Sequence, residues 1–307
     1  MPEPLFIAGA TASGKSAAAV EIATRIGGEI VNADAFQLYR GLDILTAKPT
    51  KQELAAAQHH LYSVLKPGES FNAAAYEALA KPAIKEIAAR GKVPIIVGGS
   101  GLYLKTLTHG LSPLPSADAN VRAELEALSL EERVAELLRL DPGAEKVIDL
   151  ANPRYVTRAL EICILTGEPA SVLQKHWNER QVEFRGVYLS WEREVLYQRI
   201  NARTEQMLAA GAVEEVAEFS VADGEVLSET AEKAIGVREI RSHLAGELSL
   251  EETVAAIQQA TRRYAKRQQT WFNRETGFKS ICLNPGDDAC SVADQVLAQF
   301  PKLQKQP

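Results

Sequence analysis

The sequence predicts an α/β protein in which a parallel sheet flanked by helices carries a helical insertion. Three short apolar runs, at residues 5–8, 29–33 and 92–97, have the length and composition of buried strands. Helical periodicity follows the first run and lies between the second and the third, an alternation typical of parallel sheets covered on both faces. From Asp118 to about Asn178 only helical signals occur, which indicates an insertion into the α/β core.

The elements of the first half follow one another without long gaps. The first apolar run ends at Gly9, and residues 16–26 then place apolar side chains at helical spacing before a Gly-Gly pair. Asp34 stands at the C-terminal end of the second predicted strand. Residues 71–90 predict a helix that contains a proline, and the third strand closes at Gly98-Gly99.

The second half predicts the insertion and the return to the core. We expect residues 1–112 and 183–307 to form the core and residues 113–182 the insertion, because prolines and serines mark a linker after residue 111. A strand is expected at residues 186–190, and residues 195–272 are helical in pattern. The predicted insertion helices are 121–128, 130–140, 153–165 and 169–177. The last seven residues are expected to be frayed.

Composition narrows the class of protein. The chain has 307 residues, of which 46% are hydrophobic and 24% charged, as in ordinary globular proteins. It contains no apolar run of the ~20 residues that span a bilayer and no signal-peptide pattern at its start. The three cysteines form no Cys-x-x-Cys pair, so neither a zinc site nor a disulfide framework is indicated. We therefore expect a cytoplasmic protein without a membrane partner.

A phosphate-binding loop follows the first strand. Gly9, Gly14, Lys15 and Ser16 match the pattern G-x-x-x-x-G-K-[ST], between a predicted strand and a predicted helix. Glycines let backbone N–H groups approach an anion, and the helix N-terminus adds a favourable dipole. Lys15 would neutralise phosphate oxygens, and the Ser16 hydroxyl could hold Mg²⁺. The fold is therefore expected to be P-loop NTPase-like, but kinases, NTPases and diphosphate-using transferases all satisfy this loop.

Asp34 lies at the sheet edge where open α/β proteins bind ligands. A carboxylate there could hold Mg²⁺ through water or act as a general base. From position alone it could equally be a helix cap or a turn residue. Phe36 and Gln37 suit stacking on a base and hydrogen bonding to its edge, although both are common in ordinary loops. His59 and His60 are adjacent and cannot face one metal from a helix, which favours a structural role.

The formal net charge of −6 argues mildly against a nucleic-acid partner. Residues 262–274 are a local exception, with five basic side chains and no acidic one. Arg262, Arg263, Lys266 and Arg267 would form one stripe on a helix. Such a stripe could follow the phosphates of a nucleic acid or be a solvated helix face with some arginines packed on the core.

Several motifs in the chain resemble those of one enzyme family. They lie at residues 9–16, 34–44, 46–49, 97–103, 154–161, 234–239 and 261–272. In this order they resemble the bacterial tRNA dimethylallyltransferases, the tRNA isopentenyltransferases of the IPP transferase family. The phosphate loop alone is a weak match, but it becomes specific in combination with the Asp-x-x-Gln-x-Tyr and Lys-Arg-Gln-x-Thr-Trp stretches.

The resemblance implies transfer of a dimethylallyl group from dimethylallyl diphosphate to the exocyclic amine of the adenosine on the 3′ side of the anticodon. Asp34 would be the base or hydrogen-bond acceptor for that amine, and Ser100 would lie beside it. Arg203 is the candidate for a second cation on the leaving diphosphate, with Arg199 and Arg193 as alternatives.

The remaining site residues are also carried over from the family. The diphosphate would be held by Gly9, Thr11, Ala12, Ser13, Gly14, Lys15 and Ser16, with Mg²⁺ near Ser16. The tRNA anticodon stem-loop would be contacted by Asp34, Ala35, Phe36, Gln37, Ser100, Arg122, Arg154, Arg158, Arg262 and Lys266. The expected enzyme is a monomer, because one chain supplies one complete site.

The chain departs from the family at a few positions. Ala35 stands where the family often has serine, so a hydroxyl contact is lost there, whereas Ser16 and Ser100 replace the common threonine and keep the hydroxyl. Three other functions remain open at this point. They are a small-molecule kinase that uses the loop for ATP, a prenyltransferase that acts on free adenine nucleotides, and a tRNA-binding protein without catalysis.

Overall fold

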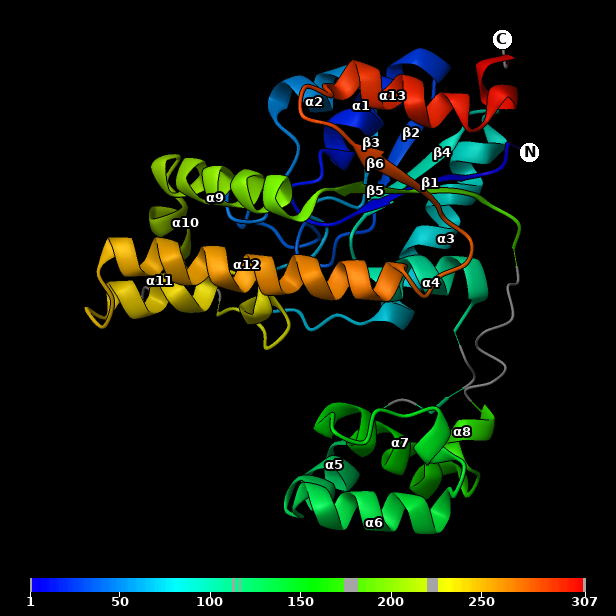
Figure 1. Ribbon diagram of the computed structural model, residues 1–307, viewed down its shortest axis with the longest axis vertical. Coiled ribbons are helices and arrows are strands. Elements are labelled where there is room, and N and C mark those ends of the chain that lie inside the picture. The colour runs from blue at the N-terminus through cyan, green and yellow to red at the C-terminus, as the bar shows by residue number, and fades with distance from the viewer. Residues whose placement is uncertain (1, 112–113, 116, 174–181, 220–225, 306–307) are drawn as a thin grey trace. The chain divides into compact units, whose positions relative to one another are not determined.

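The computed structural model describes residues 2–111, 114–115, 117–173, 182–219 and 226–305. The chain divides into two compact units (Figure 1). Unit 1 joins Met1–Leu107 to Glu183–Pro307, and unit 2 comprises Thr108–Val182. Each unit has a hydrophobic core of its own.

Unit 1 is built on a six-stranded parallel sheet in the order β3-β2-β4-β1-β5-β6. The strands are β1 (Leu5–Gly9), β2 (Glu29–Asn32), β3 (His59–His60), β4 (Pro94–Gly98), β5 (Arg185–Trp191) and β6 (Lys279–Leu283). The predicted strands are all present, because their apolar runs are buried on both faces of the sheet. The edge strands β3 and β6 were not predicted: β3 has two residues, and β6 buries only alternate side chains.

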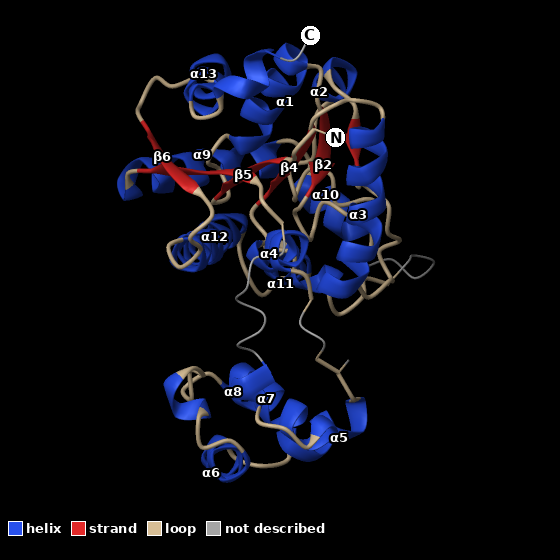
Figure 2. Cartoon of the chain, turned by 90° about the vertical axis from the view of Figure 1, so that its right-hand side faces the viewer, coloured by secondary structure: helices blue, strands red, loops and turns tan. Residues whose placement is uncertain are grey.

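Helices cover both faces of this sheet. Unit 1 contains α1 (Lys15–Ile26), α2 (Lys51–Ala56), α3 (Ala73–Ala89), α9 (Arg193–Ala209), α10 (Ala212–Glu218), α11 (Val237–Leu244), α12 (Leu250–Phe272) and α13 (Ala289–Ala298), with 3₁₀ turns η3 (Ala231–Lys233) and η4 (Pro301–Lys305). It also contains α4 (Gly101–His109) except for its last two residues, which belong to unit 2. Figure 2 shows α1, α2 and α13 on one face and α3, α4 and α12 on the other. The parallel sheet flanked by helices is thus as predicted.

The sequence raised three local expectations, which concern the proline in residues 71–90, the C-terminus and the histidine pair. Pro82 lies inside α3 without ending it. The expected fraying at the C-terminus is wrong for the described part, because η4 inserts Leu303 into the core at 1% exposure. The histidine pair is structural, as favoured: His60 Nε2 lies 2.7 Å from the Glu29 carboxylate, and His59 Nδ1 lies 2.8 Å from a backbone carbonyl oxygen.

Unit 2 is helical in its described part. It contains α5 (Ala119–Glu126), α6 (Leu130–Leu140), η1 (Ala144–Lys146), α7 (Pro153–Thr166) and α8 (Ala170–Leu173). Side chains such as Leu125, Leu137 and Leu160 fill its core. Residues 174–177 of the last predicted helix, including Trp177, lie outside the described residues, as do Ser112, Pro113 and Ser116 of the predicted linker.

The site is positioned by the carboxyl ends of three neighbouring strands. β2, β4 and β1 are adjacent and parallel, so the segments after Asn32, Gly98 and Gly9 leave the sheet at one edge. These segments lie very close together, because a Cβ on Gly98 would come within 2.1 Å of the Ala33 carbonyl oxygen. Glycine at this position therefore allows the Asp34 turn and the Ser100 turn to pack side by side.

Candidate active site

The loop between β1 and α1 has the strand–loop–helix context that the motif predicted. Gly14 caps α1 with φ +89°, a conformation that side chains rarely adopt. Lys15 Nζ donates to the Ala10 carbonyl oxygen at 3.3 Å, and Ser13 N donates to the same oxygen at 3.2 Å. The first turn of α1 contains no acidic residue, so its N-terminus can accept an anion.

Two side chains from outside the motif support this loop. Trp191, at the end of β5, donates from its indole N–H to the Ser13 carbonyl oxygen at 3.0 Å. Arg199, on α9, donates from Nε to the Ala12 carbonyl oxygen at 2.9 Å, and its guanidinium lies 4.5 Å from the centre of the Trp191 ring. Because both loop carbonyls are bound from outside, their negative ends are directed away from an anion in the loop.

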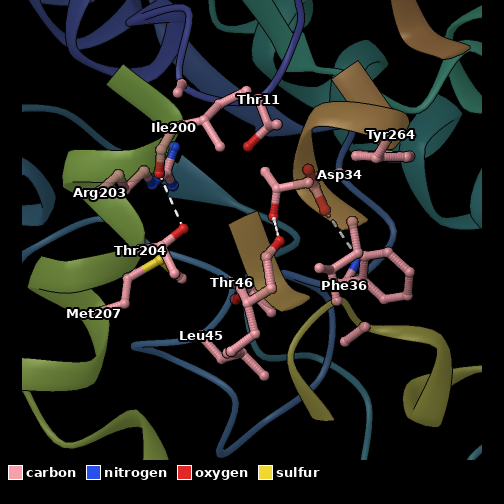
Figure 3. Close-up of a pocket in the computed structure, with 15 residues that line it drawn as sticks. Thr11, Asp34, Phe36, Leu45, Thr46, Ile200, Arg203, Thr204, Met207 and Tyr264 are labelled. Atoms are coloured by element: carbon pink, nitrogen blue, oxygen red, sulfur yellow. Dashed lines mark hydrogen bonds between the residues drawn. The ribbon is translucent and has the colours of Figure 1, made fainter. Parts of the chain in front are cut away.

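The Asp34 turn is built by its own side chain and by Asn32. The Asp34 N–H donates to Asn32 Oδ1 at 2.8 Å, and Asn32 Nδ2 donates to the carbonyl oxygens of Asp34 and Leu61. Phe36 N–H donates to Asp34 Oδ1 at 3.0 Å. Asp34 is thus a turn residue and also a cavity residue (Figure 3), and its second carboxylate oxygen has no hydrogen-bond partner among the described residues.

One cavity joins the phosphate loop to the Asp34 turn. It is lined by Thr11, Ala12, Asp34, Phe36, Leu45, Thr46, Ile200, Arg203, Thr204, Met207, Ala234, Ile235, Ile257, Thr261 and Tyr264. Figure 3 shows Thr11, from the phosphate loop, on one side of Asp34, and Leu45 and Met207 on the other. The cavity therefore combines a phosphate-binding region and a carboxylate with an apolar wall.

The charges of the cavity favour an anion. Burial lowers the pKa of Lys15 to about 8; the nearby Asp34 carboxylate opposes this shift, and the Arg203 cation adds to it. Burial also lowers the pKa of Arg203, again opposed by Asp34. Two desolvated cations thus face one carboxylate, and an anionic ligand would offset the remaining positive charge.

The three arginines that the sequence left as alternatives now differ. Arg203 lines the cavity, and the pKa shifts of Lys15 and Arg203 place its charge near both Lys15 and Asp34. Arg199 is bound to the outside of the phosphate loop. Arg193 is exposed and donates to the Tyr197 hydroxyl at 3.3 Å. The geometry thus favours Arg203 for contact with a ligand in the cavity.

Thr11 and Gln37, which were predicted to bind ligands, each have a polar group that is hydrogen bonded within the protein. The Thr11 backbone N–H donates to Gln268 Oε1 at 2.9 Å, so this N–H is already used within the protein although Thr11 lines the cavity. Gln37 is buried, and its Nε2 donates to the carbonyl oxygens of Thr46 at 2.9 Å and Ala47 at 3.0 Å. The amide nitrogen of Gln37 therefore holds the loop that lines the cavity, and its contact with tRNA stays a prediction.

Residues that sequence reasoning missed hold the same loop. Glu215 of α10 accepts the backbone N–H groups of Asp43, Ile44 and Leu45 at 2.6 to 2.8 Å. Lys48 Nζ donates to Asp43 Oδ1 at 2.5 Å and to Ser63 Oγ at 2.8 Å. No local pattern singles out Glu215, because its partners lie about 170 residues away in the sequence.

Two of the basic residues predicted to contact tRNA in unit 2 are each paired with the same buried glutamate. Arg122 Nε and Arg158 Nη1 lie 3.2 and 2.6 Å from the carboxylate of Glu161, which is fully buried. This pairing lowers the pKa of Glu161 although burial acts to raise it. Arg154, in contrast, is exposed. The tRNA contacts of all three arginines stay predictions.

The basic stripe of α12 divides into two kinds of residue. Arg262 Nη1 donates to Asn201 Oδ1 at 2.7 Å and packs this part of α12 onto α9. Arg263, Lys266 and Arg267 are exposed, with Arg267 lying 5.6 Å from the centre of the Tyr264 ring. The stripe thus has the mixed character that the sequence allowed.

Two kinds of feature are absent from the described part of the chain. No helix there has the length and apolarity needed to cross a membrane. The same residues contain no cluster of three or more His, Cys, Asp or Glu side chains that could hold a metal ion by themselves.

Comparison with known proteins gives one consistent family. The family model described as IPP transferase matches residues 37–275. A curated tRNA dimethylallyltransferase of Geobacter metallireducens is 45% identical over 89% of this chain and 90% of its own length, and one of Geobacter sulfurreducens is 44% identical over 90% and 91%.

Solved structures agree with this result. The full-length tRNA isopentenylpyrophosphate transferase of Bacillus halodurans is similar with a TM-score of 0.74 and 34% identity, covering 99% of this chain and 98% of its own. A eukaryotic dimethylallyltransferase described as acting on tRNA reaches a TM-score of 0.81 at 25% identity, covering 100% of this chain and 81% of its own.

Proposed function

Because this chain belongs to the IPP transferase family, we propose that it transfers the dimethylallyl group of dimethylallyl diphosphate to N6 of the adenosine that follows the anticodon in tRNA. The bond between C1 of the donor and the diphosphate oxygen breaks, a bond between C1 and N6 forms, and diphosphate leaves. The observation that carries this proposal is the cavity that joins the phosphate loop and Asp34 to an apolar wall.

The apolar wall favours prenyl transfer over phosphoryl transfer. Leu45, Met207, Ile235 and Ile257 line the cavity together with Asp34, and a five-carbon hydrocarbon gains free energy by leaving water for such surroundings. A kinase would place a polar acceptor beside the terminal phosphate, where these side chains offer few hydrogen bonds. The phosphates in this site are therefore expelled by attack on carbon.

Asp34 would act on the acceptor amine. An exocyclic aromatic amine is a poor nucleophile, and a positioned base that takes its proton contributes typically ~10²–10⁴-fold. The Asp34 turn holds one carboxylate oxygen through the Phe36 N–H, which leaves the other for the proton of N6. Tyr264 also lines the cavity, and burial raises the pKa of its hydroxyl, so it would act there as a neutral hydrogen-bonding group.

Cations would stabilise the leaving group. Negative charge accumulates on the diphosphate as the C1–oxygen bond breaks, and preorganised cations and N–H groups at that position lower the barrier. We assign this task to Lys15, to Arg203 and to the backbone N–H groups of Ala12 and of residues 14–16, because the Ser13 N–H already donates to the Ala10 carbonyl oxygen. Arg199 would support them from behind the loop through the Ala12 carbonyl.

We further propose that the divalent metal ion is Mg²⁺ and that it binds with the substrate. Mg²⁺ prefers few protein ligands, several waters and substrate phosphates, which agrees with the lack of a metal-ligating cluster among the described residues. The Ser16 hydroxyl, at the start of α1, is the protein group that would hold it. When bound, the ion would neutralise charge on the diphosphate.

The tRNA substrate would be recognised by exposed side chains of both units. We assign phosphate contacts to Lys266 and Arg154, which are exposed, and base contact to Phe36, which lines the cavity. Unit 2 would serve as the tRNA-contacting insertion. A stacked base reaches the cavity only by flipping out, which requires a few kcal/mol that contacts in the pocket recover. The enzyme would act as a monomer in the cytoplasm.

One assay tests the function and its rivals. The protein is incubated with radiolabelled dimethylallyl diphosphate and with unmodified tRNA, a tRNA lacking that adenosine, or adenosine monophosphate. We expect label in the first acceptor alone. Label in adenosine monophosphate would support a nucleotide prenyltransferase, and label in none would refute prenyl transfer. Phosphate transfer from ATP to a small molecule, measured in parallel, would indicate a kinase.

A further inference from the structure

Gln268 connects two loops that follow different strands of the sheet. It is on α12 and is 5% exposed. Its Oε1 accepts the backbone N–H of Thr11, in the phosphate loop, at 2.9 Å. Its Nε2 donates to the carbonyl oxygen of Gly99, after β4, also at 2.9 Å. The two partners precede Gln268 by 257 and 169 residues, so only the fold brings the three together.

The space around this amide is fully used. A Cβ at position 99 would come within 2.1 Å of Gln268 Nε2 and within 3.0 Å of the Gly9 carbonyl oxygen. One partner is an N–H and the other a carbonyl oxygen, so the amide can satisfy both in one orientation only. Glutamate would keep the acceptor for Thr11 but would turn a second oxygen toward the Gly99 carbonyl oxygen. The site is therefore built for a primary amide.

From Gly99 the connection continues through the next residue, Ser100, to the Asp34 turn. Ser100 follows Gly99, and its Oγ accepts the Ala35 N–H at 3.0 Å, directly after Asp34. Tyr264, which lines the cavity, lies near the side chains of Ser100 and Gln268. A continuous chain of contacts thus runs from the phosphate loop, through Gln268, to the turn that carries Asp34.

We propose that Gln268 is a positioning residue that sets the separation between the diphosphate site and the acceptor base. This role rests on the proposed prenyl transfer. Attack requires the amine nitrogen about 3–3.5 Å from C1 of the donor, and a misplacement of about 1 Å can reduce the rate ~10²-fold. The Thr11 end of the bridge fixes the loop that holds the diphosphate, and the Gly99 end fixes the Ser100 and Asp34 turns that receive the amine.

The test compares three variants of the full chain. Gln268→Met removes both hydrogen bonds at similar volume, Gln268→Glu removes only the donor, and Gly99→Ala disturbs the bridge from its other end. The control is Gln259→Met, because Gln259 is exposed on the same helix. The measurements are the single-turnover rate of prenyl transfer to tRNA, the tRNA dissociation constant, the donor KM, and diphosphate released per prenyl group transferred.

We expect the single-turnover rate to fall about 10- to 100-fold in the three variants, with tRNA affinity and donor KM changed less than about threefold. More than one diphosphate should be released per transfer, because a misplaced amine allows water to attack C1 and form the five-carbon alcohol. Gln259→Met should behave as the wild type. These changes would distinguish a positioning role from a role in folding. A variant that only folds less well would have a smaller active fraction but the same ratio of diphosphate released to prenyl group transferred.

Three outcomes would overturn the proposal. The first is an unchanged rate in Gln268→Met and Gly99→Ala. The second is a fall in rate that matches a fall in tRNA affinity, which would make Gln268 a tRNA contact. The third is loss of folding in all three variants, which would make the bridge a requirement of the fold. A wild-type enzyme that prenylates no tRNA would instead refute the proposed function itself.

Discussion

Replacing Lys15 with methionine should stabilise the protein while abolishing use of the diphosphate donor. Burial lowers the pKa of this lysine from 10.5 to about 8, so the folded state holds the ammonium less favourably than the unfolded state does. One pKa unit corresponds to about 1.4 kcal/mol. The shift therefore corresponds to a destabilisation on the order of 3 kcal/mol at neutral pH, and methionine, with a similar shape, would relieve much of it.

The pH dependence gives this prediction a sign. Between pH 8 and 10.5 the unfolded lysine holds its proton and the folded one does not, so the free energy of unfolding of the wild type rises with pH in this window. The advantage of Lys15→Met should thus be largest below pH 8 and disappear above pH 10.5. Urea unfolding of Lys15→Met and of the wild type, at pH 7 and at the highest pH that permits refolding, measures the difference in their free energies of unfolding at both pH values. Lys85→Met, on an exposed lysine of α3, should change stability by less than about 0.5 kcal/mol.

The pH dependence of the catalytic activity should also reflect the ionisation of Lys15. Donor binding favours protonated Lys15, so kcat/KM for dimethylallyl diphosphate in the wild type should fall up to about tenfold per pH unit above pH 8. In Lys15→Arg this decline should be absent within the same pH range, because a guanidinium keeps its proton. Equal stability of Lys15→Met and wild type at pH 7, or the same decline in Lys15→Arg, would refute the assignment of a desolvated lysine to the donor site.

Four further substitutions probe the rest of the chain. Asp34→Asn should lower the single-turnover rate about 10²–10⁴-fold with little change in tRNA affinity from filter binding; a preserved rate would exclude Asp34 as the base. Glu215→Gln should raise the donor KM several-fold, because the amide keeps one acceptor oxygen and the Leu45 N–H loses its own; unchanged kinetics would show that the loop does not need Glu215. Glu161→Gln should destabilise unit 2 by about 1–3 kcal/mol in thermal unfolding, since two partly exposed arginines lose their buried carboxylate. Lys266→Ala should reduce the salt dependence of tRNA binding by about one ion, and an unchanged slope would remove it from the interface.

The local part of the site could be predicted from the sequence. The phosphate loop needs a strand, a glycine-rich turn and a helix in one continuous stretch, and residues 5–26 contain all three. Asp34 likewise follows from its place after a buried strand. Helix boundaries in unit 2 were close for the same reason, because capping residues such as Asp118 and Asn152 act on the adjacent turn.

The remaining contacts lie between segments far apart in the chain. Trp191 and Arg199 reach the phosphate loop across more than 170 residues, and nothing in their local pattern indicates a carbonyl partner. The same holds for Arg122 and Arg158, which the family resemblance assigned to tRNA and whose pairing with the buried Glu161 no local pattern indicates. The sequence alone does not distinguish a charged side chain that faces solvent from one that binds a phosphate or a buried carboxylate.

The sequence by itself determined the four central strands of the sheet, the phosphate loop, the place of Asp34 and the family, because each depends on neighbouring residues or on ordered motifs. Only the tertiary structure decided that Arg203 rather than Arg199 or Arg193 lines the cavity, and that Gln268 connects Thr11 to Gly99. The physical reason is that hydrogen bonds and desolvation act over a few ångströms in space. Those distances are set by the packing of α9 and α12 against the sheet edge, which no local pattern specifies.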